Sequence, residues 1–493
     1  MPLEITYLLA IIFYISIEGT LAANSTAFRT CAQLQGTLGP DIIQFSGPEY
    51  LNASTRAYSL FNTEDRPTCI VFPRETSHVQ VAMAAIFLNE VHYAVRAGGH
   101  AGMTGWNTVQ DGILFSFANM NNVSYNAAKD TITLQPGVRW GQAVAQLESQ
   151  KVAPLGGRLP DVGTGLLLGG GLNYFGAEHG FSCDAFVEVD VVLVTGQLVT
   201  ATANNEHSAL FRALKGGANR FGIATRFEVQ AVHDGTGPDK NWFGGLISYP
   251  NSSTEALLHA TQKFTSTVND PKAAILLLFL NLFNGSQVTG AHSLTLLYRG
   301  SSLPLHIFGD FLSIPSTSKQ ISSLSYLEAL NLNGPGTDID SGALFGSSAV
   351  SGDVDAYFHI YRVFNEFTLN PVVRDSLSLS FIAFTPIFKS QILAGRARGS
   401  NSFDPPLVNY AAIHFETTAA PGLLQLPSQV EAARQAAFSN MPPSAGLPLY
   451  QNESDKKQKV FATYGRFDEM KRTYKKYDPT RFNARFTEGP LGV

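Results

Sequence analysis

Three glycine-rich segments constrain this chain more than any other feature of its sequence. They are RAGGH at 96–100, GGG at 169–171 and KGGANRFG at 215–222. Because glycine has no Cβ atom, its backbone approaches other groups closely, and successive N–H groups in such turns bind phosphate. The first segment ends in His100, whose imidazole can take part in chemistry. Together the segments predict a fold that holds a large phosphate-bearing cofactor.

The composition is that of a globular protein with more than one domain. The 493 residues are 44% hydrophobic and 15% charged, which is enough apolar material for sizeable cores. The formal net charge is −5, and no run of Lys or Arg exceeds two residues. A nucleic-acid partner is therefore not expected.

The N-terminus has the pattern of a secretory signal. An apolar run covers residues 5–17 and small residues follow at 21–23, which predicts a signal peptide over 1–23. The apolar run is short for a membrane span. A short uncleaved anchor is the alternative, because Glu4 is the only charged residue before the run. Both interpretations predict entry into the secretory pathway. The expected protein is secreted or in the secretory pathway, without a stable membrane span.

Three cysteines and six glycosylation sequons agree with that route. In an oxidising compartment, we expect Cys31 and Cys69 to pair and to leave Cys183 without a partner. Three buried thiols are the alternative. The Asn-x-Ser/Thr tripeptides begin at Asn24, Asn52, Asn122, Asn251, Asn284 and Asn452. They predict a glycoprotein, although such tripeptides also arise by chance.

The segment after residue 67 has the pattern of a strand, a helix and a second strand. A β-branched run at 69–72 precedes apolar residues at helical spacing over 76–89, and a short strand follows at 93–96. His100 therefore lies on the loop that leaves the second strand. Open α/β units receive phosphate-bearing ligands at such loops.

Further elements are expected along the chain. The sequence predicts strands at 112–117, 131–134, 187–194 and 221–229, and helices at 139–149, 207–214 and 467–477. After residue 234 charges become sparse and long apolar stretches alternate with loops. We therefore expect a domain boundary near residue 235.

One later strand is expected to have a polar face. Within 409–416, Tyr410, Ala412, His414 and Glu416 share one side of the alternating pattern. The apolar residues between them occupy the other side. The polar side is expected to line a pocket.

Seven motifs carry a family resemblance. They are PTCIV at 67–71, RAGGH at 96–100, QPG at 135–137, LGGG at 168–171, HGFSCD at 179–184, VVLVTG at 191–196 and GIATRFE at 222–228. In this order they resemble the berberine-bridge-enzyme-like FAD-linked oxidoreductases. The resemblance resumes at 464–465 and 476–479 and is weak in between.

The resemblance implies an α+β fold class. The expected fold is the two-domain PCMH-type FAD-binding fold of the vanillyl-alcohol-oxidase superfamily, with an inserted substrate domain built on an antiparallel sheet flanked by helices. It implies an FAD-binding domain over 24–234, a substrate domain over 235–440 and a C-terminal segment, 441–493, that returns to the FAD-binding domain.

The resemblance also implies FAD as the cofactor. His100 matches the histidine that the family joins to the 8α-methyl group of the flavin; a histidine that caps a turn is the alternative. Some relatives add a second bond from a cysteine, but Leu159 stands at that position, so a bond through His100 only is expected. The other expected cofactor contacts are Arg96, Ala97, Gly98, Gly99, Ala101, Gly102, Gly163, Gly165, Gly170, Gly171, Gly222, Ile223, Ala224 and Asn452.

Three positions depart from the family pattern. The glycine loop at 162–168 is one residue short, and Ala101 replaces a frequent serine. Asn452 and Glu453 begin a sequon where the family has Asn-Tyr-Ala. Asn452 is not expected to be both buried beside a flavin and glycosylated.

The implied chemistry is the removal of two electrons from a small organic substrate. A hydride passes to the flavin, a base takes a proton from a neighbouring O–H or N–H group, and O2 reoxidises the flavin to give hydrogen peroxide. Tyr410, His414 and Tyr450 are the candidate bases, although tyrosines in sheets are often structural. No metal site is expected.

The expected function is that of an FAD-dependent oxidase or dehydrogenase in specialised metabolite biosynthesis. Oligosaccharide oxidases of the family generally carry the cysteine that Leu159 replaces. A secreted carbohydrate or alcohol oxidase is the first alternative. The second is a non-redox cyclase or ligand-binding scaffold on the same fold.

Overall fold

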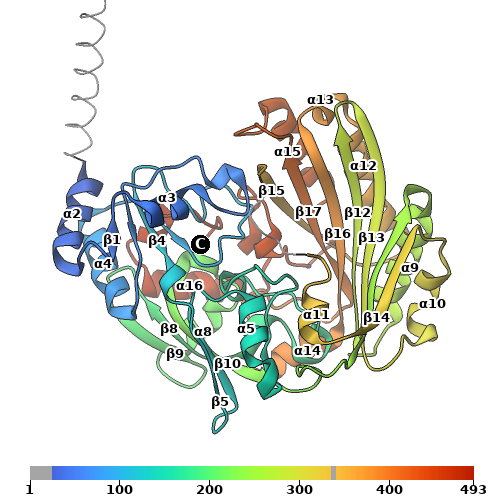
Figure 1. The fold of residues 1–493 in the computed structure, drawn as a ribbon, viewed down its shortest axis with the longest axis horizontal. Helices are drawn as coiled ribbons and strands as arrows, with labels where there is room; N and C mark the ends of the chain where they lie inside the picture. Colours follow the sequence, from blue (N-terminus) through green and yellow to red (C-terminus); the bar gives the residue numbers. More distant parts are fainter. Residues whose placement is uncertain (1–24, 335–339) are drawn as a thin grey trace, which may run out of the picture.

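The computed structural model describes residues 25–334 and 340–493 (Figure 1). The predicted signal peptide, 1–23, and the sequon at Asn24 lie outside the described residues. Within the described ranges, no helix has both the length and the apolar character needed to cross a membrane. Three β-sheets with surrounding helices make up the fold, which confirms the predicted α+β class.

The first sheet contains the predicted strand, helix and strand. Its order is β1 (Ile43–Gln44), β2 (Cys69–Val71), β4 (Ile113–Ser116) and β3 (Tyr93–Arg96). The strands β2, β4 and β3 run parallel, and α4 (Thr76–Asn89) connects β2 to β3. The predicted bounds hold to within one residue, because each element buries an apolar face in the same core.

A disulfide joins Cys31 on α2 (Thr26–Leu38) to Cys69 on β2. The expected pairing is therefore present, and Cys183 is a buried free thiol. The bond spans a sequence separation of 38 residues, which includes α3 (Pro48–Thr55) and the segment that follows it. That segment reaches the third sheet.

The second sheet is antiparallel. Its order is β5 (Val123–Asn126), β6 (Thr131–Leu134), β10 (Ile223–Val232), β8 (Phe186–Val192) and β9 (Leu198–Thr202), and β7 (Ala153–Pro154) also pairs with β10. The helices α5 (Trp140–Leu147) and α8 (Ser208–Leu214) pack into its core. The sequence did not predict β5 or β9, because both are partly exposed strands with few buried apolar residues.

The third sheet has seven antiparallel strands. Its order is β14 (Ser318–Leu324), β11 (Trp242–Pro250), β13 (Gln287–Arg299), β12 (Ala273–Asn284), β16 (Leu377–Ile387), β17 (Tyr410–Ala419) and β15 (Ala343–Val350). One face is covered by α9 (Thr254–Thr267), α10 (Leu305–Ser313), α12 (Val354–Leu369) and α15 (Ser428–Asn440) (Figure 1). The predicted boundary near residue 235 falls between β10 and β11.

Side chains of β17 alternate between the two faces of this sheet. Ile413 and Phe415 are fully buried in the core beneath the helices. His414 and Glu416 therefore point to the opposite face, which looks toward the first two sheets. This is the alternation predicted from the sequence.

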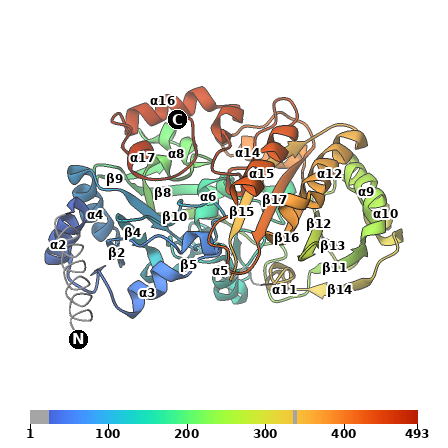
Figure 2. The same ribbon diagram turned by 90° about the horizontal axis from the view of Figure 1, so that it is seen from above.

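The C-terminal segment returns to the first two sheets (Figure 2). The helix α16 (Phe467–Tyr477), which has the predicted bounds, packs against α8, and α17 (Phe482–Phe486) follows it. The buried Arg220 guanidinium donates hydrogen bonds to the main-chain carbonyls of Asn483 and Thr487 at 2.7 and 2.9 Å. Arg220, which precedes β10, thus fixes the C-terminal segment to the second sheet through these hydrogen bonds.

Replacing both cysteines, Cys31→Ser with Cys69→Ser, is expected to lower the free energy of unfolding by roughly 3–4 kcal/mol. The disulfide restricts the unfolded chain, and for a loop of this length the loss is of that order. Guanidinium unfolding followed by circular dichroism measures the change. Reductant should destabilise the wild type and leave the double variant unchanged; equal stability of the two oxidised proteins would contradict the prediction.

Candidate functional site

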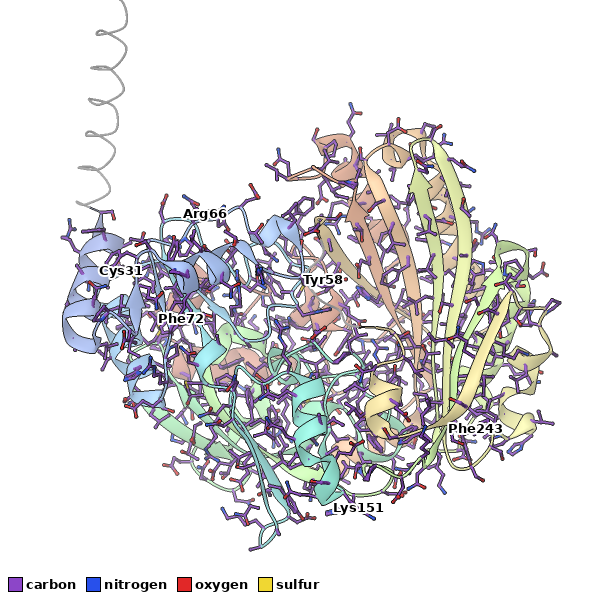
Figure 3. All side chains as sticks on the ribbon, in the orientation of Figure 1. Cys31, Tyr58, Arg66, Phe72, Lys151 and Phe243 are labelled. Atoms are coloured by element: carbon purple, nitrogen blue, oxygen red, sulfur yellow. A yellow bond between two sulfur atoms is a disulfide. The ribbon has the colours of Figure 1, made fainter. Side chains whose placement is uncertain are left out.

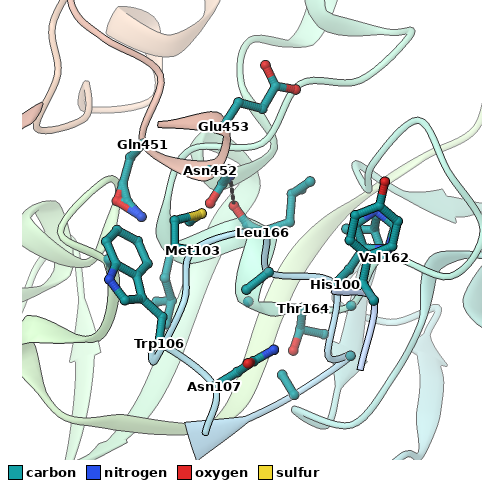
Figure 4. Close-up of a pocket in the computed structure, with 18 of the residues that line it drawn as sticks. His100, Met103, Trp106, Asn107, Val162, Thr164, Leu166, Gln451, Asn452 and Glu453 are labelled. Atoms are coloured by element: carbon teal, nitrogen blue, oxygen red, sulfur yellow. Dashed lines mark hydrogen bonds between the residues drawn. The ribbon is translucent and has the colours of Figure 1, made fainter. Parts of the chain in front are cut away.

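A cavity of about 570 Å³ lies between the first two sheets and the open face of the third sheet. Its walls come from the loop after β3, the glycine-rich segment 158–168 and the strands β12, β15, β16 and β17. Residues 450–453 of the C-terminal segment close another side (Figure 4). The volume is typical of a cavity that holds an organic ligand.

The loop after β3 crosses the glycine-rich segment with the two backbones in direct contact. A Cβ atom on Gly98 would lie 2.6 Å from the Cα atom of Gly163, and a Cβ atom on Gly163 would meet Gly98 at the same distance. Arg139 Nη2 donates a hydrogen bond to the Gly98 carbonyl at 2.9 Å. The crossing requires glycine at both positions, and it fixes the loop that carries His100.

The buried Arg96 stabilises the same loop through hydrogen bonds to main-chain carbonyls. Arg96 Nε donates a hydrogen bond to the Asn107 carbonyl at 3.0 Å, and Arg96 Nη1 donates to the Arg56 carbonyl at 2.8 Å. Its side chain is thus directed into the protein and away from the cavity. This arrangement ties the loop of His100 to the segment after α3.

Six buried polar atoms on the cavity wall have no hydrogen-bond partner among the described residues. They are Trp106 Nε1, Asn107 Oδ1, Asn219 Oδ1, His414 Nε2, Gln451 Oε1 and Thr487 Oγ1. An unpaired buried polar atom costs about 1–3 kcal/mol, so a ligand that pairs with these atoms gains stability from them. Their spread over several elements fits an extended ligand with many donors and acceptors, as FAD is.

A buried carboxyl faces the cavity from β17. Glu416 is 3% exposed and accepts a hydrogen bond at 2.8 Å from the Tyr58 hydroxyl; Tyr58 lies beside the third sheet (Figure 3). Burial raises the pKa of Glu416 to about 7, the charge of Glu453 adds to the rise, and the bond from Tyr58 opposes it. A carboxyl with this pKa can take up and release a proton near neutral pH.

His414 lies on the same face of β17 as this carboxyl. Its Nε2 atom is 3.9 Å from Oε2 of Glu416 and makes no hydrogen bond with it. The rings of Phe345 and Phe381 meet the imidazole edge-on, with centroids 4.7 and 5.3 Å away. Burial, helped by the charge of Arg158, lowers the pKa of His414 to about 3. The imidazole is therefore neutral at physiological pH.

Tyr450 and Asn452 are hydrogen-bonded to each other on the C-terminal side of the cavity. Asn452 Nδ2 donates to the Tyr450 hydroxyl and to the Leu166 carbonyl, both at 2.9 Å (Figure 4). The Tyr450 hydroxyl also accepts from the Leu172 N–H at 3.0 Å. Burial raises the pKa of Tyr450 far above its ordinary value. Tyr450 therefore keeps its proton.

An ion pair forms the polar corner of the cavity. Arg158 Nη2 donates to Glu453 Oε1 at 2.8 Å, and Arg158 Nη1 donates to Thr385 Oγ1 at 2.6 Å. Burial raises the pKa of Glu453, and the charge of Arg158 opposes the rise. Each buried charge thus has a partner. Glu453, which stands where the resemblance places a tyrosine, is paired with a residue of the glycine-rich segment.

Known FAD-binding proteins are similar in sequence to this chain. A family model described as an FAD binding domain matches residues 67–202. An FAD-linked oxidoreductase from Arthroderma benhamiae is 27% identical over 453 residues, which is 87% of each chain. An FAD-dependent monooxygenase from Aspergillus calidoustus is 28% identical over 381 residues, 76% of this chain and 71% of its own.

Solved structures share the fold. A carbohydrate oxidase from Microdochium nivale has a TM-score of 0.74 at 19% identity, covering 94% of this chain and all of its own. The BBE-like 1 protein from Physcomitrella patens has a TM-score of 0.72 at 20% identity, covering 94% of this chain and 99% of its own. The chain is therefore an FAD-linked oxidoreductase, and its fold is that of the berberine-bridge-enzyme-like proteins. The predicted PCMH-type fold is thereby confirmed.

Eleven residues that the resemblance assigned to the cofactor line the cavity of this FAD-linked oxidoreductase. They are Ala97, Gly98, Gly99, His100, Ala101, Gly163, Gly165, Gly222, Ile223, Ala224 and Asn452. Their contacts with FAD stay a prediction, and their convergence on one cavity supports it.

Four other residues of that assignment, Arg96, Gly102, Gly170 and Gly171, are not among the residues that line the cavity. Their contacts with FAD stay a prediction. A Cβ atom on Gly102 would meet the Phe345 ring, and Cβ atoms on Gly170 and Gly171 would meet Phe403 and Ser182. At these three glycines the backbone packs closely against neighbouring side chains. The motif gave their positions in the sequence but not the directions in which they face.

The candidate bases of the oxidoreductase separate into two groups. His414 and Tyr450 line the cavity. Tyr410 is buried at the other end of β17, where it lines a separate small hollow with Phe403 and Tyr464. Tyr410 lies on the predicted face of the strand but does not line the main cavity, and its role as a base stays a prediction without support from this geometry.

Several polar side chains at the cavity are not among the predicted site residues. Glu416 lay on the predicted polar face, and the alternation of β17 was a signal for it. Tyr58, Trp106 and Arg158 lie in segments without regular periodicity, and no local pattern pointed to them. Tyr58 and Glu416 are 358 residues apart in the chain, so only the fold brings them together.

Glycan mapping by mass spectrometry of the oxidoreductase secreted from a eukaryotic host should find no glycan at Asn452. Its side chain holds two hydrogen bonds inside the protein, and a Cβ atom on Gly169 would lie 2.0 Å from Asn452 Oδ1. The sequons at Asn52, Asn122, Asn251 and Asn284 begin with exposed residues and serve as internal controls. A glycan at Asn452 would contradict this packing.

Proposed function

We propose that this oxidoreductase is an FAD-dependent oxidase that acts on a small, largely apolar organic substrate in specialised metabolism, with O2 as the acceptor. The observation that carries the proposal is the buried Glu416 carboxyl, which opens onto the same cavity as the loop of His100. The cavity thus combines an FAD-binding loop with a group that accepts protons near neutral pH.

When bound in this cavity, FAD would supply the two-electron chemistry, as a hydride acceptor for a substrate C–H bond with O2 as the final electron acceptor. The protein supplies the proton transfer. Glu416, as the carboxylate, takes the proton from the substrate O–H or N–H group. His414 is neutral and Tyr450 keeps its proton, so neither is as good a base at neutral pH.

We propose that FAD is covalently bound through His100 alone. His100 lies on the loop fixed by the crossing of Gly98 and Gly163, inside the cavity wall. Leu159, which also lines the cavity, has no thiol with which to form a second bond. A glucooligosaccharide oxidase from Acremonium strictum, whose solved structure has the same fold, carries a novel flavinylation.

The substrate wall of the cavity is mainly apolar. Leu276, Leu278, Phe381 and Ala383 line it from β12 and β16, and Phe345 from β15. The one arginine of the polar corner is already paired with Glu453. These walls suit a neutral apolar molecule with a single ionisable O–H or N–H group more than a sugar, whose many hydroxyls need polar partners.

Two further observations support the proposed setting. Several fungal relatives are FAD-dependent monooxygenases by name. The disulfide between Cys31 and Cys69 suits an oxidising compartment, in agreement with a secreted or secretory-pathway protein. A carbohydrate oxidase is the second candidate, because solved structures of the same fold include oxidases of oligosaccharides.

A substrate panel separates these candidates. Purified protein is mixed under anaerobic conditions with benzylic and phenolic alcohols and with oligosaccharides, and bleaching of the flavin is recorded. We expect bleaching by the aromatic alcohols, and hydrogen peroxide on readmission of air. Bleaching by oligosaccharides alone would contradict the proposal of an apolar substrate. A yellow protein that no compound of the panel bleaches would support a non-redox scaffold.

The His100→Ala variant is expected to lose covalent FAD. Acid-precipitated wild-type protein should be yellow, because the flavin is attached through the His100 ring, and the pellet of the variant should be colourless. The His92→Ala variant is a matched control, since His92 is exposed and packs against Phe486 outside the cavity. A yellow pellet from His100→Ala, or a colourless one from the wild type, would refute the linkage.

The Glu416→Gln variant is expected to reduce the rate of flavin bleaching by about 10²–10⁴-fold, which is the range for loss of a general base. In the wild type this rate should fall as the pH drops through about 7, because protonation removes the base. The variant should lack that dependence. Stopped-flow absorbance measures both, with exposed Glu255→Gln as the control. A wild-type bleaching rate that does not change with pH near 7 would exclude Glu416 as the base.

A further inference from the structure

A short segment connects the loop of His100 to the third sheet; we call residues 56–62 the strap. The Tyr58 N–H donates a hydrogen bond to the Gly99 carbonyl at 3.1 Å. Two residues later, the Leu60 N–H donates to the Ser341 carbonyl at 3.0 Å. The strap is thus bonded through its main chain to both walls of the cavity.

Two buried side chains of the strap repeat this double attachment. The Ser59 hydroxyl donates to the Ala343 carbonyl at 2.8 Å and accepts from the Ala343 N–H at 2.9 Å. Asn62 Nδ2 donates to the Ala101 carbonyl at 2.9 Å. Buried, fully bonded groups of this kind hold a segment in one conformation. The strap is therefore a rigid support for the residue at its centre.

That residue, Tyr58, contacts both chemical groups of the site. Its ring packs on the His100 imidazole, with ring centroids 3.9 Å apart and an angle of 31° between the planes. The Tyr58 ring also packs against the ring of Phe345, with ring centroids 5.8 Å apart. Its hydroxyl donates to Oε1 of Glu416 at 2.8 Å. One side chain thus joins the expected attachment point of the flavin to the expected base.

We propose that Tyr58 is a positioning residue for the oxidation: its ring orients the His100 imidazole for attachment to the flavin, and its hydroxyl orients the Glu416 carboxyl. The proposal rests on the proposed roles of His100 and Glu416. With Oε1 bonded to the phenol, Oε2 is the oxygen that accepts the substrate proton. Burial and the neighbouring Glu416 raise the pKa of Tyr58 well above its ordinary value, so the phenol stays a donor.

The surroundings of Glu416 make this bond easy to isolate experimentally. Its cross-strand neighbours on β15 and β16, Phe345 and Phe381, carry no charge. The polar or ionisable side chains around it are Tyr58, His414, Thr418, Glu453 and Arg158, which is paired with Glu453. Tyr58 donates the shortest of the hydrogen bonds that the Glu416 carboxyl accepts, since the bond from Thr418 is 3.4 Å long.

Tyr58→Phe keeps the ring and removes the hydroxyl. The protonation of Glu416 is followed in the purified FAD-containing protein by the infrared C=O stretch of its protonated carboxyl, with the band assigned by its loss in Glu416→Gln. We expect a midpoint near pH 7 in the wild type and a midpoint about one pH unit higher in Tyr58→Phe, because the bond stabilises the carboxylate. Covalent FAD should be retained.

Tyr58→Leu removes the ring as well. We expect covalent attachment of FAD, followed by in-gel fluorescence after denaturation, to be roughly two- to tenfold slower than in Tyr58→Phe, since an aromatic contact of this kind is lost. Tyr298→Phe is the matched control for both measurements. Tyr298 donates to Asp270 at 3.0 Å, and neither residue lines the cavity.

An unchanged midpoint in Tyr58→Phe, together with normal covalent FAD, would overturn the role of the hydroxyl. Attachment in Tyr58→Leu as fast as in Tyr58→Phe would overturn the role of the ring. A wild type without covalent FAD would refute the proposed linkage and the ring's role together. The infrared titration would still decide the role of the hydroxyl, because it does not depend on the linkage.

Discussion

The contact between Gly98 and Gly163 is the constraint on which the site depends. At 2.6 Å from an added Cβ atom to the opposite Cα atom, neither position can carry a side chain unless the loops separate. One loop carries His100 and the other leads to Asn452 and the C-terminal wall. The cofactor side of the cavity is therefore set by backbone geometry.

The substrate side is set by the two-residue period of a strand. Successive residues of β17 face the helices and the cavity in turn, so an apolar core beneath the sheet requires His414 and Glu416 to face the cavity. Burial then acts on the two side chains in opposite directions. It raises the pKa of the carboxyl and lowers that of the imidazole, because in each case the uncharged form is favoured. One environment thus produces a carboxyl that titrates near neutral pH and a neutral histidine.

The sequence predicted those helices and strands that bury an apolar face with a regular period. The elements from β2 to β3, the helix α16 and the alternation of β17 were predicted, because each buries an apolar face with a regular period. The contact of Gly102 with the Phe345 ring and the location of Tyr410 at the far end of its strand depend on tertiary packing, which no local pattern shows. The bond from Tyr58 to Glu416 joins residues that are 358 positions apart in the chain. No spacing within the sequence could reveal it.

The crystal structure of the protein purified with its flavin tests the central claim most directly. The claim is that the cavity holds FAD attached to His100 and presents the Glu416 carboxyl to the substrate. It predicts continuous electron density from the His100 ring into a flavin within the cavity, with Glu416 facing the bound ring system and hydrogen-bonded to Tyr58. A flavin bound elsewhere, or one in the cavity without contact with His100 and with Glu416 turned away, would contradict it.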